Sequence, residues 1–90
     1  MKTIFLDCRR MQEREAAHAY LAKRLHFPAY YGKNLDALYD LLTDRGTEAE
    51  KLRIVLEHAQ SWEEQSAYCQ KILKVFEEAA KDCGFRLFFF

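Results

Sequence analysis

The chain has 90 residues, half of them apolar or aromatic, with 14 basic and 14 acidic side chains. This length suits one hydrophobic core, so we expect residues 1–90 to form a single domain, and so apolar a composition excludes a disordered chain. Zero net charge gives no general attraction to nucleic acid or to a membrane, so a charged partner must be recognised by a local cluster.

The first predicted element is a strand at residues 2–6, an apolar run that contains β-branched side chains. Asp7, Arg9 and Arg10 end this run before it reaches the length of a signal-peptide core. No other stretch approaches the roughly 20 apolar residues of a membrane span. We therefore expect a cytoplasmic protein.

Two amphipathic helices are predicted next, one through residues 17–25 and one through residues 35–42, from apolar side chains at helical spacing. Asn34 is suited to cap the second helix because its side chain can accept a hydrogen bond from a free amide of the first turn. That helix should therefore begin at Leu35. The following linker contains Thr47-Glu48-Ala49-Glu50, which has capping-box spacing and leaves an added helical turn there open.

A second strand is expected at residues 52–56, then the longest helix, ending at Cys83 before Gly84, and a last strand at residues 85–90. The start of this helix is open, because Ser61 or Ser66 could cap it, giving one long helix or a short turn followed by a helix. All three strands are too continuously apolar for a sheet with one face in water, so both faces should be buried.

Strands separated by helices imply parallel strands joined by right-handed crossovers. The predicted fold class is therefore α/β, a three-stranded parallel sheet covered by three or four helices.

No catalytic or metal site is expected. The cysteines, Cys8, Cys69 and Cys83, are odd in number and lack the close spacing of a zinc site, so they should be reduced, packed thiols. The histidines, His18, His26 and His58, match no catalytic spacing with them. We therefore expect neither enzymatic activity nor a metal or cofactor.

Charged and aromatic residues gather on the second helix and the loop before it. Asp36, Asp40 and Asp44 recur every four residues along one helix face, at a cost of roughly 0.2–0.5 kcal/mol for each adjacent pair. An ordinary solvated helix face is one interpretation of this row. Tyr39 and the loop tyrosines border it, however, and aromatic anchors beside charges are typical of an interface centre whose complement is cationic.

The run Tyr30-Tyr31-Gly32-Lys33-Asn34-Leu35-Asp36-Ala37-Leu38-Tyr39-Asp40 resembles the loop and helix that define the barstar family. Weaker similarity extends to residues 54–57 and 75–79. The resemblance implies a three-stranded parallel sheet covered by helices. It also implies a protein that inhibits a barnase-type ribonuclease by occluding the active site, its carboxylates standing in for RNA phosphate.

The residues that the resemblance assigns to the partner-binding site are Tyr30, Gly32, Asn34, Asp36, Tyr39, Asp40, Thr43 and Glu78. Asp36 and Asp40 would face the cationic groups of the nuclease, with Asp40 as the leading hot-spot candidate. Lys33 departs from the best-known member, where this position is acidic, and Tyr39 replaces a larger indole.

The expected partner is an extracellular-type or toxin ribonuclease, which the chain would inhibit as an antitoxin does, with no direct contact to nucleic acid or membrane. The alternative is an interaction module that keeps the barstar fold but binds a non-ribonuclease protein. The sequence leaves open the oligomeric state and whether Tyr31 faces the partner or the core.

Overall fold

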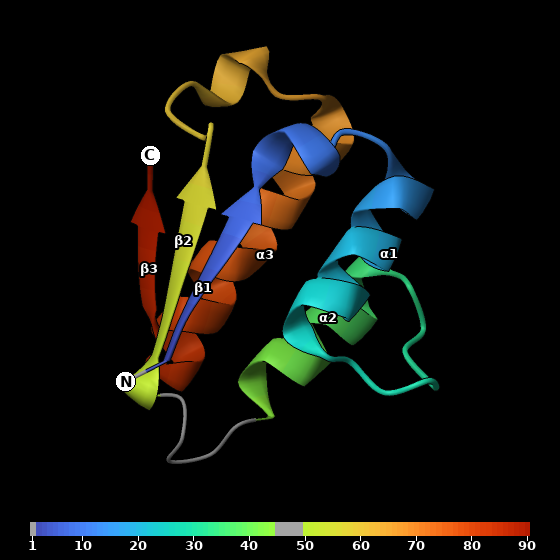
Figure 1. Cartoon of the computed structure of the whole chain (residues 1–90), viewed down its shortest axis with the longest axis vertical. Helices are drawn as coiled ribbons and strands as arrows, with labels where there is room; N and C mark the ends of the chain where they lie inside the picture. The colour runs from blue at the N-terminus through green and yellow to red at the C-terminus, as the bar shows by residue number, and fades with distance from the viewer. Residues whose placement is uncertain (1, 45–49) are drawn as a thin grey trace.

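The computed structural model describes residues 2–44 and 50–90. The strands and α-helices are, in chain order, β1 (Lys2–Asp7), α1 (Arg14–Leu25), α2 (Leu35–Thr43), β2 (Leu52–Glu57), α3 (Ala67–Cys83) and β3 (Arg86–Phe89), with short 3-10 turns at Cys8–Arg10 and Trp62–Glu64. The α/β prediction is confirmed, with three strands and three α-helices among these residues (Figure 1). Thr47, Glu48 and Ala49 of the capping-box match lie outside the described residues.

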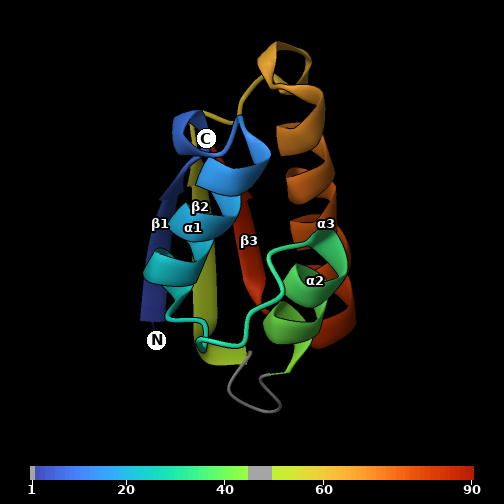
Figure 2. The same ribbon diagram turned by 90° about the vertical axis from the view of Figure 1, so that its right-hand side faces the viewer.

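The sheet is parallel and its strands follow chain order, β1-β2-β3. Two right-handed crossovers that advance in the same direction place their helices on the same face of a sheet. Figures 1 and 2 accordingly show α1, α2 and α3 together on one side of the sheet. The core must therefore lie between this helical layer and the inner face of the sheet.

The prediction that both faces of the sheet are buried is wrong. Ile4 and Leu6 of β1 point to the helices and are buried, whereas Phe5 is 50% exposed between them and Phe88 of β3 is 39% exposed. The apolar runs suggested burial of both faces because several side chains that point away from the helices are also apolar. The strand order, which the sequence does not specify, decides which face the helices cover.

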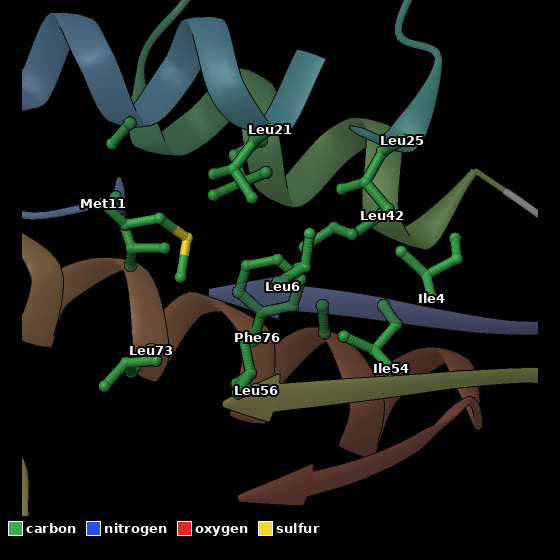
Figure 3. Packing of buried hydrophobic residues seen from close by; sticks show 14 of the residues in the cluster. Ile4, Leu6, Met11, Leu21, Leu25, Leu42, Ile54, Leu56, Leu73 and Phe76 are labelled. Carbon is green, nitrogen blue, oxygen red and sulfur yellow. The ribbon is translucent and has the colours of Figure 1, made fainter. Parts of the chain in front are cut away.

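The core is filled from every layer. Figure 3 shows its members together: Ile4, Leu6, Ile54 and Leu56 from the strands, Leu21 and Leu25 from α1, Leu42 from α2, and Leu73 and Phe76 from α3. Phe76 is the largest side chain that is fully buried. Cys8 and Cys69 are buried in this core, Cys83 is half-buried, and all three are free, as predicted.

The helix boundaries follow local hydrogen bonds. α2 begins at Leu35, as predicted, because the Asn34 side chain accepts a hydrogen bond from the amide of Ala37 at 2.7 Å. Ser66 caps α3 by accepting from the amide of Cys69 at 3.0 Å, while Ser61 makes no capping bond. A separate 3-10 turn followed by a helix is therefore the correct alternative. No helix among residues 2–44 and 50–90 could span a bilayer.

Gly84→Ala should lower the free energy of unfolding by about 1–2 kcal/mol. Gly84 ends α3 with φ of 97°, and its amide donates to the carbonyl of Ala80 at 2.8 Å. An added Cβ would meet no atom within 4 Å, so the loss would come from the backbone conformation alone. Urea denaturation measures it, and Gly84→Asn should lose less because asparagine tolerates left-handed backbone. Equal losses for both variants would contradict this explanation.

Candidate functional site

The two loop tyrosines point in opposite directions. Tyr30 is 80% exposed, whereas Tyr31 is buried and its ring packs on Phe27 with ring centroids 4.7 Å apart. The Tyr31 hydroxyl lies 2.5 Å from Nδ1 of His18, and Nε2 of His18 lies 2.6 Å from the hydroxyl of Tyr68. The structure thus places Tyr31 in the core and leaves Tyr30 available to a partner.

His18 ties the loop to α1 and α3 through these two hydrogen bonds. It is the one polar or charged side chain that is fully buried among the described residues. Burial, and to a lesser extent the charge of Arg14, lowers the pKa of His18 below its usual value. A neutral imidazole has one donor and one acceptor nitrogen, which matches two tyrosine hydroxyls. Sequence reasoning missed this link because the partners are far apart in the chain.

Wild-type stability should fall as the pH drops from 7 to 5 because of His18. Its folded-state pKa lies below the unfolded value of about 6.5, so between these two values the unfolded chain binds a proton that the folded chain does not. Stability is therefore full above about 6.5 and declines as the pH falls toward the folded pKa. Denaturation of wild type and His18→Gln across this range measures the effect. The variant should be less stable at pH 7 but show a flatter profile; an unchanged slope would contradict the assignment.

Gly32 is required by the space around it and not by a left-handed backbone conformation. The left-handed residue in this loop is Lys33, with φ of 53°. A Cβ on Gly32 would come within 3.3 Å of the Ala37 Cβ and of Nδ2 of Asn34. A larger residue here would therefore push against the capped first turn of α2.

An acidic groove lies between α2 and α3, which pack side by side (Figure 2). Its volume is about 490 Å³, and we define the acidic groove by its lining residues, Leu35, Asp36, Tyr39, Asp40, Val75 and Glu78. The fold thus brings four of the predicted site residues together from two helices. Three of them are exposed carboxylates, and the lining contains no basic side chain.

Tyr39 anchors the acidic groove. Its hydroxyl donates a hydrogen bond to the carboxylate of Asp82 on α3. This bond, together with burial and the negative charges of Asp82, Glu78 and Asp40, raises the pKa of Tyr39. Sequence reasoning did not include Asp82, although it lies four residues after Glu78 on the same helix, a spacing that could have indicated it.

The other predicted residues lie outside the groove lining. Asn34 caps α2, and the hydroxyl of Thr43 donates to the carbonyl of Tyr39 at 2.9 Å, so it is already bonded within the helix. Arg14 shares a hollow with Asn34, Leu35, Asp36 and Tyr68 and a second hollow with Lys33. Two cations therefore flank the helix start, which sequence reasoning noticed only for Lys33.

The chain matches the family model described as Barstar (barnase inhibitor) across residues 1–90. The chain belongs to the barstar family. A relative from Bacillus subtilis (strain 168), named "Putative ribonuclease inhibitor YrdF", is 37% identical over 83 residues, covering 91% of this chain and 89% of the relative.

Barstar-family membership confirms the family resemblance seen in residues 30–40. It also confirms the prediction that the chain is not an enzyme, because the family consists of inhibitors without enzymatic activity. It also fits the chemistry of the groove. The lining of the acidic groove contains no cation, so its carboxylates can accept charge-assisted hydrogen bonds from a partner's Arg or Lys side chains. Among the described residues no cluster of His, Cys, Asp and Glu could hold a metal ion.

Proposed function

We propose that the protein inhibits a barnase-type ribonuclease by inserting the loop and helix of residues 30–43 into the active site. The acidic groove is the observation that carries this proposal, since Asp36, Asp40 and Glu78 surround Tyr39 with no basic side chain among them. A nuclease active site holds cations that bind RNA phosphate. Carboxylates in their place would block substrate without turnover.

Each site residue has a distinct role in this proposal. Tyr30 is the exposed aromatic that packs on the enzyme. Gly32 lets the loop pack closely on the first turn of α2 and, being exposed, presents its backbone to the enzyme. Asn34 holds the start of α2, and Tyr39 supports the neighbouring carboxylates. Thr43 lies at the rim of the contact. Such an inhibitor would act in the cytoplasm on a toxin or extracellular-type ribonuclease.

A second candidate function is binding of a protein other than a ribonuclease. The cations of Arg14 and Lys33 favour it, because they lie beside the acidic row and would repel a strongly basic enzyme. This alternative keeps the same surface but assigns it a partner of mixed charge. The two candidate functions therefore differ in which partner protein binds and not in which surface of this chain it binds.

Capture from a native lysate followed by a ribonuclease assay distinguishes them. The immobilised chain should retain a ribonuclease, and adding one equivalent of soluble chain should suppress its activity. Lys23→Glu on α1 is a control that should capture as well as wild type, because Lys23 is exposed on a helix that does not line the groove. Retention of a partner without ribonuclease activity would favour the second candidate.

Association with the ribonuclease should depend only weakly on salt. The chain has zero net charge, and residues 30–44 carry three aspartates against Lys33, a local charge of −2. Complementarity then acts mainly over short range, since screening reaches about 8–10 Å at ordinary ionic strength. We expect the association rate constant to fall less than about threefold from about 50 to about 500 mM salt in stopped-flow measurements. A steep fall would indicate long-range steering instead.

A further inference from the structure

The sheet face without helices carries three rows of outward side chains. The pairing register defines a basic row of Thr3, Arg53 and Arg86. It defines an apolar row of Phe5, Val55 and Phe88. It defines an acidic row of Asp7 and Glu57. The apolar row, with two partly exposed phenylalanines, therefore separates opposite charges on an open sheet.

The charges of the outer rows are only partly matched within the chain. The side chains of Arg53 and Arg86 make no hydrogen bond or ion pair with other described residues, and Nε of Arg53 is buried without a partner there. Asp7 is paired with Arg9 at 2.9 Å, whereas Glu57 is exposed and forms no ion pair within residues 2–44 and 50–90. Arg53 and Glu57 lie four residues apart on one strand, about 13 Å, so they do not meet each other.

We propose that this face binds a second copy of the chain, sheet to sheet, about a two-fold axis that runs along the apolar row. This rotation reverses the strand direction and keeps the strand order. It places Arg53 of each copy opposite Glu57 of the other and stacks Phe5 and Phe88 on their own counterparts. The contact is isologous, so each favourable charge pair occurs twice.

Charge selects this arrangement over others. A two-fold axis along the strands would set basic row on basic row and acidic row on acidic row, which is repulsive. A single-stranded nucleic acid would gain from Arg53 and Phe88 but would meet Asp7 and Glu57 at the other end of the face. Zero net charge removes the long-range repulsion that usually keeps identical chains apart.

Self-association through the open sheet face would be weak and would leave the acidic groove free to bind another partner. Three strands about 4.8 Å apart and about five residues long give a footprint on the order of 250 Å², well below the ~800 Å² per partner of a stable interface. We expect a dissociation constant of about 10⁻⁴ M. Figure 2 shows α2 and α3 on the helical side of the sheet, and the groove is lined by residues of these two helices, so the dimer does not depend on the proposed inhibition.

Charge reversal tests the proposed axis by sedimentation equilibrium from about 10 µM to about 1 mM. Arg53→Glu and Glu57→Arg should each weaken self-association by at least about tenfold, because both repeated pairs become repulsive. Mixed in equal amounts, the two variants should associate at least as strongly as wild type, since both pairs are then complementary. Lys71→Glu, the same charge change on the helical side, should leave self-association unchanged.

Phe88→Lys provides a second variant at an exposed edge position, in case Arg53→Glu fails to fold, and circular dichroism monitors folding of each. It should also abolish association. A wild type that stays monomeric at about 1 mM, or a variant mixture that stays monomeric, would overturn the proposal. The proposal would also be overturned if the monomer bound a labelled oligouridylate through this face, shown by the loss of that binding in Phe88→Asp.

Discussion

Asp40→Ala should weaken ribonuclease inhibition by about 2–5 kcal/mol, or roughly 30- to 4,000-fold in the dissociation constant. This range is the one known for buried charge pairs between proteins, among them those of barnase with barstar, a member of the same family. The reason for a large effect is that truncation leaves a nuclease cation buried without its partner. Titration of inhibited enzyme at increasing inhibitor concentration measures the loss.

Asp44→Ala is the matched control for Asp40→Ala, because Asp44 continues the same helix row but does not line the acidic groove. It should change the dissociation constant by less than about threefold, as expected for a solvent-exposed charge. Both variants should keep wild-type denaturation midpoints within experimental scatter, since Asp40 and Asp44 are exposed. If Asp40→Ala inhibits as well as wild type, the proposed mechanism fails.

Phe76→Ala should destabilise the fold by about 3–5 kcal/mol. Phe76 is fully buried where α3 meets the inner face of the sheet, and truncation leaves a cavity among Leu6, Leu56 and their neighbours (Figure 3). Small domains have only about 5–15 kcal/mol of stability, so this loss is a large share of the total. Urea denaturation at pH 7 measures it.

Phe88→Ala makes the same chemical change on the open face and serves as the comparison for Phe76→Ala. Phe88 is 39% exposed in the monomer, so the loss should be below about 1.5 kcal/mol. The measurement should be made at low micromolar concentration, where self-association does not contribute. Similar losses at both positions would mean that the inner layer is not the main stabilising core.

Local signals allowed much of the fold to be predicted from the sequence. The start of α2 follows from Asn34, because its side chain accepts a hydrogen bond from a backbone amide within the first helical turn. The end of α3 follows from Gly84, which adopts the left-handed conformation. The choice between Ser61 and Ser66 stayed open because Ser61 has capping-box spacing while Ser66 could cap a later start. Two hydrogen bonds that Ser66 donates to Gln12, a residue distant in the chain, favour Ser66.

The features that the sequence did not predict depend on contacts between distant residues. Whether Tyr31 faces the core depends on His18 and Tyr68, which come from α1 and α3. Which sheet face remains open depends on the strand order, which apolar periodicity does not encode. The acidic groove was predicted in part, because its aspartates share one helix. The hydrogen bond from Tyr39 to Asp82 joins α2 to α3, and the row of aspartates on α2 did not indicate it.

The parallel strand order also determines when the protein can become active during synthesis. Each residue of β1 pairs with a residue of β2 far along the chain, beginning with Lys2 and Leu52. The acidic groove needs Glu78 and Tyr39 on adjacent helices, so it forms only after α3 docks. Because domains fold as units once their chain has emerged, a ribosome would release nearly the whole chain before any inhibitory surface exists. The proposed inhibition would thus begin only after α3 has been synthesised and has docked.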